Sequence, residues 1–195
     1  MKKHVGIVLR KYSNRDDRFS VLDRSEGKII CMSYEVNLMQ GSLISYFISR
    51  AGFFCTITGV QTLAAPFAVA RQDLLFLHHV LELCYYFLPA HDVAEKTFDL
   101  LTLLYTPIDS LKKVLQKKFF LFKLLVSFGA YTQMAPLSID SFNRLSSESI
   151  DSLSNSLLHL EIERNMDEWL CSCVGAHPCF GNFKTFHFLT KIRLP

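Results

Sequence analysis

Apolar and polar side chains alternate along Val5–Tyr12, the pattern of a half-buried β-strand, and four further short segments bounded by turns also favour strands. In the first segment this alternation places Val8 and Arg10 together on the side opposite Leu9. Turns are predicted at Ser25-Glu26-Gly27 and at Arg50-Ala51-Gly52, where glycine permits positive φ. The predicted strands are Val5–Tyr12, Phe19–Asp23, Lys28–Tyr34, Leu43–Ser49 and Phe53–Val60. Five strands of this length favour a small closed or nearly closed barrel of the OB kind.

After Pro66 the apolar residues recur at steps of three and four, the period of helices with a buried face. The predicted helices end, in turn, at Pro89, at Thr106-Pro107 and at Gly129. The predicted helices are Asp73–Leu88, His91–Tyr105, one capped by Asp109 or Ser110, and one capped by Ser152 or Ser154. The predicted fold class is α+β, with a five-stranded OB-type β-barrel in residues 1–65 and an all-α domain in residues 66–195. The all-α domain includes an atypical aromatic and basic C-terminal tail.

The helix that ends at Gly129 combines a broad apolar side with a lysine-rich arc. The apolar side comprises Leu111, Val114, Leu115, Phe119, Phe122, Leu125 and Val126. The other arc comprises Lys112, Lys113, Gln116, Lys117, Phe120 and Lys123. An exposed Phe120 among ammonium groups would suit an acidic peptide that ends in an apolar side chain. The alternative is that Phe120 packs on a neighbouring element and the lysines are solvated.

Composition indicates a chain that folds around an apolar core, because 50% of its 195 residues are hydrophobic and only 20% are charged. The net charge of +3 conceals two basic segments, residues 1–35 and 111–137, separated and followed by acidic ones. Basic segments of this kind are typical of proteins that touch phosphates, and also of solvated lysine-rich surfaces. Six scattered cysteines and the absence of a signal peptide or a membrane span predict a reduced, cytoplasmic protein.

Signals for catalysis are weak in this sequence. Cys171-Ser-Cys173 and His177-Pro-Cys179 offer soft metal ligands, but their spacing is tighter than that of ordinary zinc sites, so free thiols are the alternative. A cysteine nucleophile with His78, His79 or His187 as base has no supporting local signature. Glycine-rich phosphate loops are also missing. No enzyme activity, no cofactor and no metal site are predicted.

The order and the amino-acid sequences of several segments resemble the RecO family of bacterial recombination mediators over residues 4–131. The N-terminal matches are Gly6-Ile7-Val8-Leu9-Arg10 with Tyr12, Asp17-Arg18, and Glu26-Gly27-Lys28. The matches in the helical part are Leu81-Glu82-Leu83, Phe98-x-Leu100-Leu101, and Phe120-x-Phe122-Lys123-Leu124-Leu125 followed by Gly129 and Tyr131. The ordered set carries the resemblance rather than any one motif.

The resemblance implies a DNA repair and recombination protein without catalytic activity, located in the bacterial cytoplasm at the nucleoid. It implies binding of single- and double-stranded DNA, annealing of complementary strands, and loading of recombinase onto DNA coated by single-strand-binding protein. The implied partners are RecR and the acidic tail of the single-strand-binding protein, and no membrane is involved. The residues expected to hold that tail are Lys112, Lys113, Lys117, Phe120 and Lys123.

Binding of DNA by the barrel would use basic side chains on phosphates and tyrosines on bases. The phosphate candidates are Lys2, Lys3, Arg10, Lys11, Arg15, Arg18, Arg24 and Lys28, and the stacking candidates are Tyr12 and Tyr34. Neutralising the phosphates of two strands would promote annealing without any covalent step. Two rival interpretations remain: a protein-interaction adaptor whose barrel does not bind DNA, and a zinc or thiol enzyme that uses the C-terminal cysteines and histidine.

Overall fold

The computed structural model describes residues 2–13, 16–34, 38–51, 54–106, 114–130, 143, 145, 147, 159–185 and 187. The chain divides into two compact units, residues 1–107 and 108–195, and each is described by itself. The last strand of the barrel ends at Ala64, next to the expected boundary at residue 65. The compact unit that contains the barrel continues through the helices that follow it, as far as Pro107.

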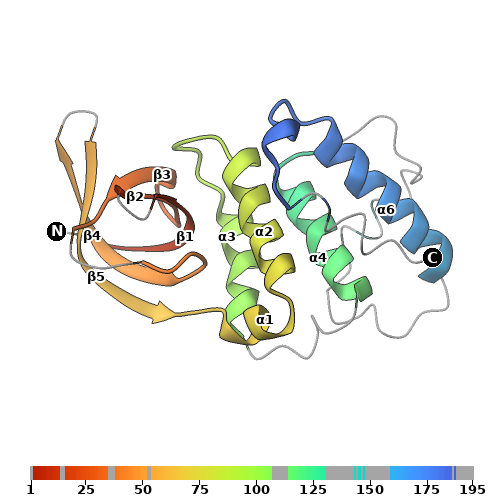
Figure 1. Ribbon diagram of the computed structural model, residues 1–195, viewed down its shortest axis with the longest axis horizontal. Coiled ribbons are helices and arrows are strands. Elements are labelled where there is room, and N and C mark those ends of the chain that lie inside the picture. The colour runs from red at the N-terminus through yellow and green to blue at the C-terminus, as the bar shows by residue number, and fades with distance from the viewer. Residues whose placement is uncertain are drawn as a thin grey trace. The chain divides into compact units, whose positions relative to one another are not determined.

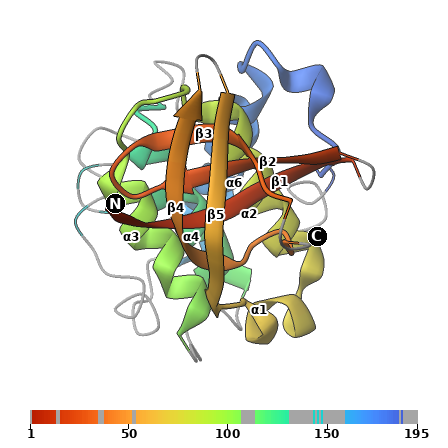
Figure 2. The ribbon, with the colours of Figure 1, turned by 90° about the vertical axis from the view of Figure 1, so that its left-hand side faces the viewer.

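The first unit opens with a closed five-stranded barrel, which confirms the predicted OB-type fold (Figures 1 and 2). Its strands are β1 (Lys3–Ser13), β2 (Asp16–Asp23), β3 (Gly27–Met32), β4 (Leu43–Ala51) and β5 (Phe54–Ala64). They follow one another around the barrel in the order β1-β2-β3-β5-β4, with β1 closing against β4. The β3–β5 pair is parallel at Met32 and Thr56, and the other pairs are antiparallel.

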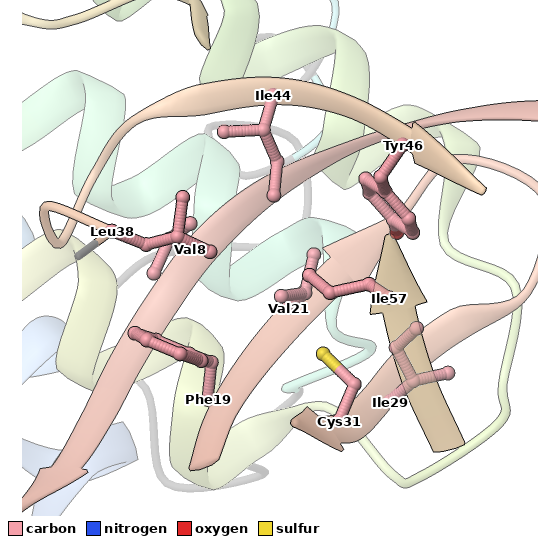
Figure 3. Close-up of a cluster of buried hydrophobic side chains, with 9 residues drawn as sticks. All are labelled: Val8, Phe19, Val21, Ile29, Cys31, Leu38, Ile44, Tyr46 and Ile57. Atoms are coloured by element: carbon pink, nitrogen blue, oxygen red, sulfur yellow. The ribbon is translucent and has the colours of Figure 1, made fainter. Parts of the chain in front are cut away.

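Alternate residues of every strand fill the barrel interior (Figure 3). These buried side chains are Val8, Phe19, Val21, Ile29, Cys31, Ile44, Tyr46 and Ile57, joined by Leu38 from the segment before β4. Gly6 also lies on this side, and a Cβ there would come within 2.5 Å of Val21 Cγ1 and 2.8 Å of the Tyr46 hydroxyl. The missing side chain at Gly6 therefore leaves room for the Tyr46 ring.

The β2–β3 turn is built on Gly27, whose φ of +73° is easy only for glycine. A Cβ at Gly27 would also lie 2.1 Å from the carbonyl oxygen of Asp92, so the turn and the 88–94 segment pack closely. In that segment His91 N donates to Lys28 O at 2.9 Å, next to an isolated bridge between Lys28 and Ala90. The turn predicted at Gly27 is confirmed.

Three helices and a short 3-10 turn complete the first unit and lie beside the barrel in Figure 1 and behind it in Figure 2. They are α1 (Phe67–Gln72), α2 (Leu74–Phe87), α3 (Glu95–Thr102) and η1 (Leu103–Tyr105). Helix α2 is confirmed, with Asp73 as its N-cap accepting from Phe76 N at 2.9 Å. It packs on β1, where Ile7 and Leu9 point away from the barrel interior and are fully buried.

The second predicted helix is shorter than expected. The spacing predicts a helix from His91, whereas α3 begins at Glu95. The pairing of the preceding segment with Lys28, together with the positive φ of His91, holds residues 90–91 in a non-helical conformation. A contact with a distant strand thus overrides the local helical period.

The second unit contains α4 (Val114–Ser127), α6 (His159–Gly175) and η4 (Phe180–Asn182). Helix α4 ends at Ser127, two residues before the predicted stop at Gly129, where Gly129 N donates to Val126 O and Ala130 N donates to Leu125 O. The caps expected at Asp109 or Ser110, and at Ser152 or Ser154, lie outside the described residues. Among the helices described, none is both long and apolar enough to cross a membrane.

The predicted division of α4 into an apolar side and a lysine-rich arc is confirmed for Phe119, Phe122 and Leu125, which are buried, and is wrong for three other residues. Gln116 and Phe120 of the expected exposed arc are buried, whereas Val114 of the expected core side is 40% exposed. The helix is apolar on most of its circumference from Phe119 to Leu125, which is typical of a helix covered on several sides. Lys118 is fully buried as well, and its Nζ lies 2.9 Å from Oδ2 of Asp167 on α6.

Candidate nucleic-acid interface

Cationic and tyrosine side chains meet where the outer face of β1–β3 reaches the C-terminal end of α2. The Tyr85 ring lies 4.7 Å from Arg10 Cζ and 5.3 Å from Lys28 Nζ, measured to the ring centroid. The hydroxyls of Tyr12 and Tyr85 are 3.2 Å apart. Arg18 Cζ lies 5.8 Å from the Tyr12 ring centroid. We call the outer surface formed by Arg10, Tyr12, Arg18, Lys28, Tyr34 and Tyr85 the cation–aromatic face.

A bulge in β1 places Arg10 on this face. Strict alternation would have put Arg10 on the inward side with Val8, but the register shifts between Val8 and Arg10, so that Arg10 pairs with Ser20. The shift turns Arg10 outward, where its Nη1 donates to the Tyr86 hydroxyl at 3.5 Å. The prediction that Arg10 shares the side of Val8 is therefore wrong.

The end of α2 supplies acceptors as well as rings. Lys28 Nζ donates to the main-chain carbonyl oxygen of Tyr85 at 2.6 Å. Carbonyl groups in the last turn of a helix lack intrahelical partners and carry partial negative charge, so a lysine there is stabilising. Lys28 thus joins the start of β3 to α2 and lies beside the Tyr85 ring.

Hydrogen bonding and the neighbouring tyrosines keep Arg10 cationic in this cluster. Burial alone would lower the pKa of Arg10, but the hydrogen bond to Tyr86 and the surrounding tyrosines raise it above its ordinary value. Burial and the hydrogen bond to Tyr85 raise the pKa of Tyr12, and Arg10 and Arg18 act in the opposite direction. At neutral pH Tyr12 is therefore uncharged and Arg10 carries a positive charge.

The outer end of the cation–aromatic face is open to solvent. Arg18 is exposed and pairs in register with Met32 of β3. The Tyr34 side chain is 70% exposed, and its hydroxyl lies 3.8 Å from the Met32 sulfur. Ile30, two residues before Met32 on β3, is 54% exposed. This part of the surface therefore presents a cation and flat or apolar side chains together.

Other predicted DNA-binding residues lie elsewhere. Lys2 and Lys3 are exposed at the start of β1, where Lys3 pairs with Phe47 of β4. Lys11 pairs with the inward-facing Phe19, and its Nζ lies 5.9 Å from that ring. Arg24 forms a 2.9 Å ion pair with Asp99 of α3. Arg15 lies outside the described residues.

The expected partner-tail residues do not present an exposed aromatic side chain. Phe120 is fully buried, so the prediction that it is exposed among lysines is wrong and the packing alternative holds. Lys117 and Lys123 are partly buried, and Lys123 Nζ lies 5.1 Å from the Phe119 ring. Lys112 and Lys113 lie outside the described residues.

The C-terminal cysteines do not assemble a metal site in the described part of the chain. Within those residues, no group of three or more histidine, cysteine or acidic side chains could hold a metal ion. His177 Nδ1 instead accepts from the main-chain N of Cys179 at 3.1 Å. Cys171, Cys173 and Cys179 form no disulfide bond. On α2, His78 is exposed and His79 is buried.

Tyr85, Tyr86 and Ile30 are the members of this region that the sequence did not identify as functional candidates. Tyr85 follows the three-to-four spacing of the apolar positions of α2, but it is only partly buried. The available signal was the position of two adjacent tyrosines in the last turn of a helix, just before Pro89.

The fold and this face define a class of protein: an OB-type barrel joined to helices, with a cationic and aromatic surface on β1–β3. Comparison with protein-family models and with curated proteins finds no match to the chain.

Proposed function

We propose that the chain is a non-catalytic DNA-binding protein that holds DNA on the cation–aromatic face and promotes annealing of complementary strands. The observation that carries this proposal is the grouping of Arg10, Arg18 and Lys28 with Tyr12 and Tyr85 on one face of an OB-type barrel. In OB folds the face of strands 2 and 3 commonly binds oligonucleotides.

Each part of the face has a role in this proposal. Arg18, which is exposed, contacts phosphate, and Tyr34, which is 70% exposed, stacks on an unpaired base. Arg10 and Lys28 are held by α2 and contribute positive potential at fixed positions. Lowering the repulsion between two phosphate backbones lets complementary strands pair.

The wider mediator role is proposed from the resemblance to the RecO family alone. It comprises loading of recombinase onto DNA coated by single-strand-binding protein, with RecR as partner. Burial of Phe120 removes the apolar contact that was expected for the acidic tail of the coating protein, so α4 is not proposed as its site.

A salt titration of DNA binding tests the proposal. The full chain is titrated into a fluorescein-labelled oligo(dT) between 50 and 300 mM NaCl, concentrations on the order of those over which counterion release is resolved. Three or four phosphate contacts predict a slope of log K against log salt of about −2 to −3. Arg18→Glu is expected to weaken binding about tenfold or more and to make that slope shallower by about one.

The matched control is Arg71→Glu, because Arg71 is an exposed arginine on α1 of the same unit. The control should bind within about twofold of the wild type, since reversing one surface charge that does not contact the strand acts weakly at these salt concentrations. An affinity that does not depend on salt concentration, or an equal loss of affinity in the two variants, would contradict the proposal. An annealing assay with complementary labelled strands then asks whether binding accelerates pairing.

The protein-interaction adaptor remains the second candidate, because Ile30 and Tyr34 expose apolar surface beside Arg18. An adaptor predicts no binding of oligo(dT) at any salt concentration, so the same titration separates the two functions.

A further inference from the structure

Tyr85 of α2 contacts three members of the cation–aromatic face, namely Arg10, Lys28 and Tyr12. Its ring lies 4.7 Å from Arg10 Cζ and 5.3 Å from Lys28 Nζ. Its ring also meets Tyr12 edge-on at 6.3 Å and Tyr86 edge-on at 5.0 Å, both between ring centroids. One aromatic ring of the helix thus touches two cations and one tyrosine of the barrel.

These contacts restrict side chains that would otherwise be mobile. An arginine over an aromatic ring is attracted to the negative face of that ring, and the attraction strengthens where water is partly excluded. Arg10 lies between the Tyr85 ring and the Tyr86 hydroxyl. The contact between the hydroxyls of Tyr12 and Tyr85 similarly holds the outer end of the Tyr12 side chain.

We propose that Tyr85 is a positioning residue of the nucleic-acid site, which holds Arg10 for phosphate and Tyr12 for a base or sugar of the bound strand. The binding surface is then composite: β1 and β2 supply the groups that touch the strand, and α2 sets their positions. This inference rests on the proposed function, because it assigns a role at the same face.

Three substitutions in the full chain test this role by the oligo(dT) titration described above. Tyr85→Leu removes the ring and the hydroxyl, and Tyr85→Phe keeps the ring that faces Arg10. Tyr105→Leu is the control for general destabilisation, because the Tyr105 hydroxyl donates to Gly41 O at 2.7 Å in the same unit, a contact made by none of the proposed binding residues. The melting temperature of each variant is measured alongside.

We expect Tyr85→Leu to weaken binding about tenfold and to make the salt slope shallower by about one, because Arg10 is no longer held for phosphate. Tyr85→Phe should recover most of the affinity and the wild-type slope. Tyr105→Leu should lower the melting temperature and leave the affinity of the folded protein within about twofold, since the hydrogen bond that it removes involves none of the proposed binding residues.

Equal affinity and slope for Tyr85→Leu and the wild type would overturn the inference and leave the proposed function standing. A loss of affinity with an unchanged salt slope, matched by Tyr105→Leu, would overturn it too, because it would report lost structure. If Tyr85→Phe is as weak as Tyr85→Leu and both slopes become shallower, the positioning role is supported with the hydroxyl as the contact. Absence of binding by the wild type would instead reject the proposed function.

Discussion

Single residues at the β2–β3 turn of the barrel show how polar groups are satisfied inside a small core. Asp23 is 1% exposed, and its Oδ1 accepts from Ser25 N at 2.8 Å and Glu26 N at 2.9 Å. Its Oδ2 accepts from the Tyr46 hydroxyl at 2.7 Å. One buried carboxylate therefore shapes the β2–β3 turn and anchors the ring that Gly6 accommodates.

Cys31 is the thiol of this core, and it predicts a pH dependence of stability. Burial, followed by the influence of Cys55 and Asp23, raises the pKa of Cys31 to about 12. In the unfolded chain the thiol ionises near its ordinary value of about 9, so between these values the folded state retains a proton that the unfolded state has lost. The stabilisation is complete below about pH 9 and is lost as the pH rises through about 12.

Between about pH 7 and pH 10.5, the free energy of unfolding of the wild type should therefore fall by up to about 2 kcal/mol more than that of Cys31→Val. Urea denaturation at the two pH values measures the difference. Ile29→Val is the control, because it alters the same core without an ionisable group. Equal pH dependence in the wild type and Cys31→Val would show that this thiol is not the source.

At the scale of elements, α4 and α6 are joined by aromatic packing and by a buried ion pair. The Phe122 ring lies 5.0 Å from the Trp169 ring of α6, between centroids. Lys118, fully buried, lies beside Asp167, whose side chain is 12% exposed. Removing one member of a buried ion pair leaves an uncompensated charge, whereas replacing both with apolar residues is often neutral.

A double-mutant cycle tests this pair. Asp167→Leu alone should lower the free energy of unfolding by about 3–5 kcal/mol, and Lys118→Met with Asp167→Leu should recover most of that loss. Trp169 is the single tryptophan of the chain and lies on α6, so its fluorescence during urea denaturation reports this unit. Additive losses in the double variant would mean that the two side chains are not energetically coupled.

At the scale of the whole molecule, the first compact unit joins the barrel to three helices. Ile7 and Leu9 are apolar, fully buried and directed away from the barrel interior, on the strand against which α2 packs. A barrel that ended at residue 65 would expose them to water. Burial of each such side chain contributes about 1.5–3 kcal/mol.

Two fragments of the chain test whether the N-terminal folding unit ends at residue 65 or at residue 107. The fragment of residues 1–107 should unfold cooperatively on heating, as followed by circular dichroism, because it retains α2. The fragment of residues 1–65 should aggregate or lack a cooperative transition, since Ile7 and Leu9 lose their cover. Cooperative unfolding of the shorter fragment would contradict this account.

Local sequence patterns were sufficient to predict the strands, α2 and the turn at Gly27. Alternation in strands and three-to-four spacing in helices reflect which side of an element meets the core, and caps and positive-φ glycines act over a few residues. These signals lie within the segment that they describe. The OB-type fold class follows from them, because five short strands have few ways to close.

The candidate site was only partly predictable, because its geometry depends on partners far along the chain. Arg10, Tyr12, Arg18 and Lys28 were candidates by residue type, but the bulge at Arg10 and the contact with Tyr85 belong to the folded arrangement. Arg24 was also a candidate by residue type, but its ion pair with Asp99 belongs to the folded arrangement.

The sequence by itself therefore determined the barrel, α2 and the presence of basic and aromatic residues on its strands. Only the tertiary structure decided which of them share a face, that Phe120 is buried, and that Lys28 pairs with Ala90 and shortens the next helix. The physical reason is range: backbone preferences and side-chain periodicity act between neighbours in sequence, whereas bulges, ion pairs and ring contacts depend on groups that folding brings together.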